Sequence, residues 1–158
     1  MITDFELTLE NTFDLDQAAA TYLPAASGNW YDTRAGKSSP DNTTSKWGAT
    51  PGLFPYVSIG VAPDNLTSVR FEVISASNVA FTSDVTTHFD SGVVLLAALT
   101  TGYELDGRFA PNDTWQRYVG WRVIIAGTTS TAGGTALLAI GPHRDVRRDY
   151  ASGLTFHS

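Results

Sequence analysis

The fold is decided by residues 118–140, which read YVGWRVIIAGTTSTAGGTALLAI. Every second side chain of the first part is apolar, as expected for a strand that is buried on one face: Val119, Trp121, Val123 and Ile125. A Thr- and Gly-rich stretch follows at residues 127–134, and residues 135–140 are again apolar. This pattern predicts two strands joined by a hairpin loop.

The same alternation recurs along the chain, with turn residues between the apolar segments. Further strands are predicted at residues 5–9, 57–61, 69–73, 78–82, 92–96, 103–109 and 154–157. One helix is predicted within Asp14–Tyr22, where the Leu23–Pro24 step would end it. A chain of about nine short strands is typical of an all-β fold, and we expect a jelly-roll-like antiparallel β-sandwich.

Length and composition restrict the class of protein. A chain of 158 residues fits a single domain, whose core we expect in residues 1–24 and 53–158. The formal net charge is −6, so no basic surface for nucleic acid is expected. The chain has no cysteine, which excludes disulfides and thiolate metal sites. We find no signal-peptide pattern and no apolar run near the roughly 18 residues of a membrane span, and expect a protein made in a cytoplasm without a membrane partner.

The segment Ala25–Gly52 differs from the rest of the chain. It has no strand periodicity and is far longer than the usual connection of about four to six residues, yet it carries Trp30, Tyr31 and Trp47. Long loops that retain aromatic residues are usually functional, so we expect an extended loop or arm whose rings contact a partner. The alternative is that these rings fold back over the domain's own core.

A second set of interface candidates is the basic cluster of Arg144, Arg147 and Arg148, which alternates with Asp145 and Asp149. Exposed arginines form bidentate contacts with carboxylates, and arginine is enriched in protein interfaces. The alternative is that these arginines pair with their own neighbours at the surface, where such pairs contribute little to stability.

No motif indicates catalysis or a bound metal. The histidines His88, His143 and His157 are far apart and lack metal-ligand spacing. Five acids near the N-terminus resemble no calcium loop, and solvated positions on an edge strand explain them more simply: Asp4, Glu6, Glu10, Asp14 and Asp16. We therefore predict no enzyme activity, no catalytic residue, no cofactor and no metal site.

Several short features in the second part of the chain share an order and spacing with a known family. They are, in chain order, Phe81-Thr82-Ser83, Leu99, Gly102-Tyr103, Pro111, Arg117-Tyr118, Thr131-Ala132-Gly133 and Tyr150-Ala151-Ser152-Gly153. Over about Pro55–Phe156 the chain resembles the capsid cement proteins, also called head decoration proteins, of tailed bacteriophages. The segment 25–52 is longer than is usual in that family.

The resemblance implies a non-enzymatic jelly roll on the exterior of the virion capsid. It implies that the protein binds the major capsid protein and bridges its subunits as a small homo-oligomer, where each second contact is intramolecular and gains avidity. We expect a homodimer rather than a homotrimer, because two-fold closure is the commonest symmetry. For Arg117-Tyr118 it favours structural roles, with the tyrosine packed at the start of a core strand and the arginine hydrogen-bonded to a turn.

Two other functions remain open from the residues alone. A carbohydrate-binding β-sandwich would use exposed Trp30, Trp47 and Trp115 to stack on sugars. A sandwich-fold glycoside hydrolase would need two carboxylates at a defined separation, which the sequence does not single out.

Overall fold

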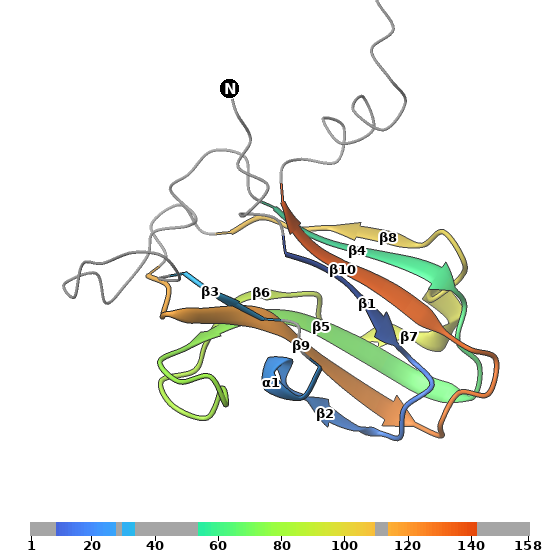
Figure 1. Ribbon diagram of the computed structural model, residues 1–158. Helices are drawn as coiled ribbons and strands as arrows, with labels where there is room; N and C mark the ends of the chain where they lie inside the picture. The colour runs from blue at the N-terminus through green and yellow to red at the C-terminus, as the bar shows by residue number, and fades with distance from the viewer. Residues whose placement is uncertain (1–8, 28–29, 34–53, 110–113, 142–158) are drawn as a thin grey trace, which may run out of the picture.

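The computed structural model describes residues 9–27, 30–33, 54–109 and 114–141, and these form two antiparallel sheets packed face to face (Figure 1). The four-stranded sheet has the order β1 (Leu9–Asp14), β10 (Thr135–Gly141), β4 (Phe54–Val61) and β8 (Glu104–Asp106). The six-stranded sheet has the order β2 (Ala20–Tyr22), β9 (Tyr118–Gly127), β5 (Leu66–Ala76) and β6 (Thr86–Asp90). Two short strands complete it, with β3 (Trp30–Asp32) on β9 and β7 (Val94–Leu95) on β5. The predicted all-β sandwich is confirmed.

The strand order is that of a jelly roll. When β3 and β7 are set aside, every consecutive pair of strands lies in different sheets except β5 and β6, which are neighbours in the six-stranded sheet. The resulting orders, β1-β10-β4-β8 and β2-β9-β5-β6, are the two sheets of that fold. The only helical elements in the described residues are a short α1 (Pro24–Ser27) and a 3-10 turn (Leu96–Ala98). None of the described helices is long and apolar enough to cross a bilayer.

Alternation along β5 and β9 fills the space between the sheets. Phe71 lies opposite Val123 and Val73 opposite Trp121, and all four side chains are fully buried. Burial of such a side chain contributes about 1.5–3 kcal/mol relative to its exposure. The period-two pattern in residues 118–126 therefore predicted both the strand and its buried face.

The predicted hairpin at residues 127–134 is wrong, because β9 and β10 belong to different sheets. The loop crosses the sandwich instead. It begins at Gly127, whose φ of +107° favours glycine, and a Cβ there would lie 2.3 Å from the backbone nitrogen of Thr67. Period-two patterns give the two strands but not the sheet to which each belongs.

The predicted helix at Asp14–Tyr22 is also wrong. The Asp14 carboxylate accepts a hydrogen bond from the backbone N–H of Asp16 at 2.8 Å, a local turn that competes with helix formation. Residues 20–22 then pair with β9 as β2. Pro24 does not end a helix but begins α1, a position that suits its fixed φ.

The predicted strand at residues 78–82 is a loop between β5 and β6. The Asn78 side-chain oxygen accepts hydrogen bonds from the backbone N–H groups of Thr82 and Ser83 at 3.0 and 3.1 Å. Phe81 has a φ of +56° and is nevertheless buried against Ile74 and Ala76. Local side-chain bonds and burial of the ring thus outweigh the strand propensity of this segment.

The remaining strand predictions differ in outcome. Those at residues 57–61, 69–73, 92–96 and 103–109 correspond to β4, β5, β7 and β8. Residues 5–8 and 154–157 lie outside the described residues. The sequence reasoning missed β2, β3 and β6, which are only three to five residues long and too short to show a clear alternation.

Phe81 provides a test of the loop. Phe81→Ala and Phe81→Gly both remove the ring and should destabilise the fold by about 3–5 kcal/mol. The Gly variant should be the more stable of the two by about 1 kcal/mol, because glycine adopts positive φ without strain. Urea unfolding of both variants measures the difference. At Ile74, in the same cluster but within β5, the order of the Ala and Gly variants should be reversed. The same order at both positions would contradict the account of Phe81.

Candidate partner-binding surfaces

Most of the described ranges begin or end at the same end of the sandwich. In the four-stranded sheet Leu9 lies opposite Ile140, and Gly141 lies opposite Phe54. In the six-stranded sheet Asp32 lies opposite Tyr118 at the start of β9. Only Thr33 separates Asp32 from residues 34–53. Because β9 and β10 are joined at their other ends, these positions share one end of the molecule (Figure 1). We call it the segment end.

Trp30 and Tyr31 lie in β3 at the segment end, so this part of the predicted arm is a strand and not a loop. Trp30 is partly buried on the outer face of the six-stranded sheet, where its ring meets that of Tyr118 edge-on at 5.7 Å between centroids. It packs against the cluster of Ile74, Ala76 and Phe81. Tyr31 points the other way and packs against the main core. Both rings thus contribute to the fold itself.

Arg117 fixes β3 at this end. Its guanidinium donates to both carboxylate oxygens of Asp32, at 2.9 and 2.8 Å, and lies 4.9 Å from the centre of the Tyr118 ring. The hydrogen bonds to Asp32 raise the pKa of Arg117 above its ordinary value. As predicted, Tyr118 opens a core strand, and the arginine has a structural role, although it binds a strand and not a turn.

The other interface candidates, Trp47, Arg144, Arg147 and Arg148, lie outside the described residues. Their segments nevertheless join the fold at the segment end, since residues 34–53 connect β3 to β4 and residue 142 follows β10. The topology therefore brings the attachment points of all six candidates to one end. Sequence reasoning had no means of placing them together, because they belong to separate segments of the chain.

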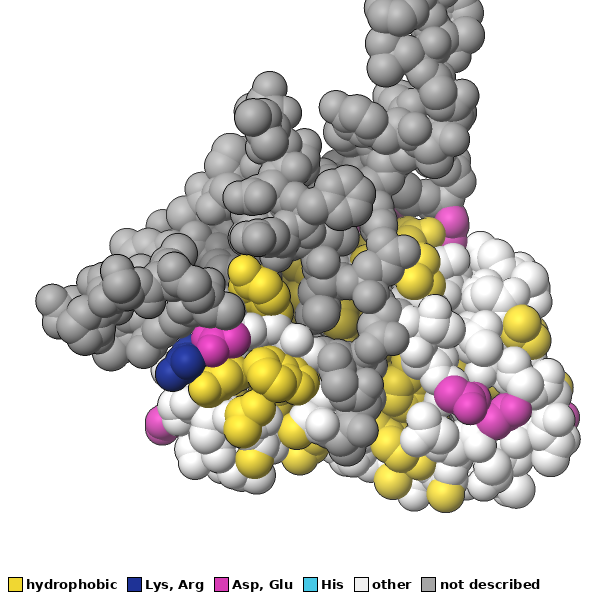
Figure 2. Space-filling model, in the orientation of Figure 1, with side chains coloured by type: hydrophobic (Ala, Val, Ile, Leu, Met, Phe, Trp, Pro, Cys, Tyr) yellow, Lys and Arg dark blue, Asp and Glu magenta, His cyan; other side chains and the backbone are white. Residues whose placement is uncertain are grey.

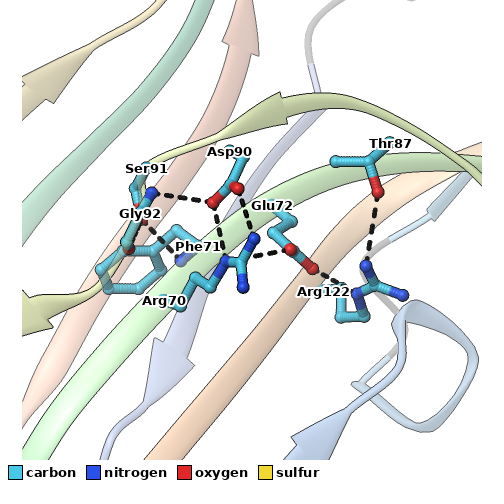
Figure 3. Close-up of polar contacts among 8 residues, drawn as sticks. All are labelled: Arg70, Phe71, Glu72, Thr87, Asp90, Ser91, Gly92 and Arg122. Carbon is cyan, nitrogen blue, oxygen red and sulfur yellow. Dashed lines mark hydrogen bonds and ion pairs between the residues drawn. The ribbon is translucent and has the colours of Figure 1, made fainter.

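The outer face of the six-stranded sheet carries a charged network that sequence reasoning missed (Figure 3). Glu72 is 3% exposed and is held between Arg122, whose Nε donates to it, and Arg70, whose Nε lies 3.1 Å from its other oxygen. Arg70 also donates to both carboxylate oxygens of Asp90, from Nε at 2.8 Å and from Nη2. The hydrogen bond from Arg70 lowers the pKa of Asp90, and Asp90 in turn raises that of Arg70.

This network is electrically balanced, with two arginines and two carboxylates. A buried carboxylate is tolerated only when its charge is compensated, and Glu72 obtains that compensation from both sides. The sequence could have indicated this network, because Arg70 and Glu72 alternate with the buried apolar residues of β5 and so share its outer face: Val69, Phe71 and Val73. The network fixes charged side chains on a face that is otherwise apolar or small.

At the end opposite the segment end, Asp64 holds the loop that crosses between the sheets. Its carboxylate accepts hydrogen bonds from the backbone N–H groups of Thr131 and Ala132 and from the hydroxyls of Ser130 and Thr131. The Ser130 hydroxyl also accepts from the backbone N–H of Asp64 at 3.0 Å. Led by the backbone bond from Thr131, these contacts lower the pKa of Asp64 to about 2.

Two of the N-terminal acids, Asp14 and Asp16, also have structural partners. Asp16 accepts a hydrogen bond from the backbone N–H of Gly134 at 3.0 Å, and Asp14 binds the backbone of Asp16. Asp14 ends β1, which is an edge strand as expected for these acids. Asp4 and Glu6 lie outside the described residues. Within the described ranges no three His, Cys, Asp or Glu side chains are grouped so that they could hold a metal ion.

One serine–histidine pair lies within the sandwich. His88 Nε2 is 2.6 Å from Ser75 Oγ, and that oxygen also accepts from the backbone N–H of Gln116 at 3.0 Å. Ser75 is fully buried, so its hydroxyl is closed to a substrate and connects β5, β6 and the chain before β9. The His88 ring stacks on Trp115, with centroids 3.8 Å apart. Trp115 is fully buried, so its expected role as an exposed sugar platform is wrong.

Acidic side chains are spread over the described surface on the side that Figure 2 shows, whereas the dark blue of Lys and Arg appears at its left edge beside an acidic group. Glu104 and Asp106 of β8, both exposed, contribute to the outer face of the four-stranded sheet. The two outer faces therefore differ, because the six-stranded sheet presents charges that are already balanced.

Comparison of the chain with models of protein families gives no match, and comparison with curated proteins gives none either. The resemblance to capsid cement proteins rests on the order of short motifs alone.

Removal of the central carboxylate tests the charged network. Glu72→Gln leaves Arg122 and Arg70 without its charge, and the free energy of unfolding should fall by about 1–3 kcal/mol. Denaturant unfolding measures the change. The matched control is Glu104→Gln on an exposed strand, which should change stability by no more than about 0.5 kcal/mol. Equal effects of the two substitutions would show that the network contributes nothing specific.

Asp64 predicts a dependence of stability on acid pH. Its pKa is about 2 in the folded protein against 3.8 in a model peptide, so the folded state favours the ionised form. The resulting stabilisation is complete above about pH 4 and is lost as the pH falls towards 2. Asp64→Asn should therefore be less stable than wild type at neutral pH, and the difference should shrink over that window. Thermal melts from pH 7 to pH 2 measure it, and a difference independent of pH would contradict the assignment.

Proposed function

We propose that the protein is a capsid cement protein, which binds the outside of a tailed-phage head and bridges major capsid protein subunits. The observation that carries the proposal is the agreement between two independent lines. The motif order from Phe81 to Gly153 resembles a family of jelly rolls, and the strand orders of the structure are those of a jelly roll. On this proposal the protein acts at the capsid exterior of the virion and has no enzymatic activity.

The points at which the candidate segments join the described fold support contact through the segment end. Residues 34–53 and 142–158, which contain Trp47 and the three arginines, join the fold there beside Trp30. Aromatic and arginine side chains dominate the energies of protein interfaces. We therefore propose that the two segments that join the fold at this end bind the capsid.

The alternatives have less support from the described residues. The carbohydrate-binding function loses Trp115 as a platform, because that side chain is fully buried, and Trp30 is partly buried against its own domain. A hydrolase would need two carboxylates free to act on a substrate. Many acids are instead engaged in holding the fold together: Asp14, Asp16, Asp32, Asp64, Glu72 and Asp90.

Attachment to heads tests the proposal. Purified protein should co-sediment with empty heads assembled from the major capsid protein, and saturating amounts should raise the temperature at which the heads disassemble. Trp47→Ala, and separately the triple replacement of Arg144, Arg147 and Arg148 by Ser, should weaken binding by about 30-fold or more. Both should leave the protein's own melting temperature unchanged.

Two controls separate binding from folding. Trp30→Ala should lower the melting temperature as well as binding, because its ring packs on Ile74 and Phe81. Ala132→Ser, an exposed change at the end opposite the segment end, should bind like wild type. Failure of the wild-type protein to bind heads, together with specific binding on a glycan array, would replace the cement function with carbohydrate binding.

A further inference from the structure

The outer face of the six-stranded sheet has a second region, at the end away from Trp30. Val93 and Leu95 are 66% and 60% exposed, the highest values among the large apolar side chains of the described residues. They flank the buried Val94 in β7, so both point away from the core on the same side of the strand. The other exposed apolar side chains lie apart from them, with Val61 at the end of β4 and Val79 and Val85 in the loop after β5.

The strands beside β7 extend this apolar surface. Leu95 lies opposite Ser68, and Ser68 lies opposite Ala126 on β9. In the next row Arg70 lies opposite Ile124, which in turn faces Thr21 of β2. Alternation with the buried residues of β5 and β9 places all of these on the outer face. We call the following residues the β7 patch: Val93, Leu95, Ser68, Ala126, Ile124 and Thr21.

Charge decides which partner suits the β7 patch. The protein has a formal net charge of −6, so two copies repel one another over most of their surfaces. At the patch border the charges are balanced, because Arg70 is paired with Asp90 and Glu72. A second copy can approach here without bringing like charges together.

The same border is complementary to itself. The side chains of Arg70 and Asp90 are 40% and 37% exposed, so both reach solvent next to the apolar residues. In a two-fold contact each Arg70 can meet the Asp90 of the other copy, and no charge is buried without a partner. The exposed aliphatic side chains of the two patches then cover each other, which removes apolar surface from water.

We propose that the β7 patch is the surface through which two copies of this chain form a two-fold dimer. The inference rests on the proposed function, which it deepens by naming the surface that would make one protein into a bridge. Ala126 precedes Gly127, where the chain leaves β9 opposite the segment end. A dimer joined at the patch therefore directs its two segment ends away from the symmetry axis, towards two separate sites on a head.

The test is the oligomeric state of the full chain. Sedimentation velocity over a range of concentrations should show a monomer–dimer equilibrium for the wild type. Leu95→Glu should raise the dimer dissociation constant at least about tenfold, since it puts a charge where an apolar contact is buried. Ala126→Arg should do the same by bulk, and it remains informative if Leu95→Glu does not fold. Val79→Glu, at the other end of β5, is the matched control and should dimerise like wild type.

Head binding separates this inference from the proposed function. The Leu95→Glu monomer should still bind empty heads, but more weakly than wild type, because it has lost the second contact. A wild type that stays monomeric at its highest soluble concentration yet binds heads would overturn the dimer surface and leave the cement function standing. Loss of head binding by Leu95→Glu with an unchanged dimer equilibrium would assign the patch to the capsid, again overturning the inference. Absence of head binding by a wild type that dimerises through the patch would overturn the cement function alone.

Discussion

The pairing of β5 with β9 is the contact on which the rest of the structure depends. It runs from Leu66 opposite Gly127 to Ala76 opposite Tyr118, and it decides which side chains enter the core. A slip of one residue would turn an entire strand face outward. Glu72 lies directly opposite Arg122, so the buried ion pair is in register only when Val73 also meets Trp121. The polar face and the core thus specify the same alignment.

Much of the fold could be predicted from the sequence, and the errors have identifiable causes. Strands with strict alternation, such as residues 118–126, reveal both their type and their buried face. The segments at residues 14–22 and 78–82 were misassigned because short polar side chains, Asp14 and Asn78, bind the nearby backbone. The alternation of apolar residues also does not show to which sheet a strand belongs. The connection after Gly127, which crosses between the sheets, was therefore predicted as a hairpin.

The candidate surfaces were less predictable than the fold. Residue type alone singled out Trp30 and Tyr31, but only the register with β9 shows that one ring faces outward and the other the core. The pairing of Leu9 with Ile140 and of Phe54 with Gly141 joins distant parts of the sequence. No local pattern encodes such proximity, because it follows from the topology of the whole sandwich. The β7 patch likewise arises from four strands, β2, β5, β7 and β9, which are separate in the chain.

The pairing of β1 with β10 also bears on how the chain could be rearranged. Since Leu9 and Ile140 are direct neighbours, the backbone enters and leaves the described fold side by side. Such closeness of the first and last strands favours circular permutation, in which a short linker joins β10 directly to β1 and new ends are opened at a surface loop. The Asp64 contacts make residues 130–132 a poor place for the new ends, because four hydrogen bonds would lose their fixed geometry. The order of the strands along the sequence could therefore be changed without changing their arrangement in the sandwich.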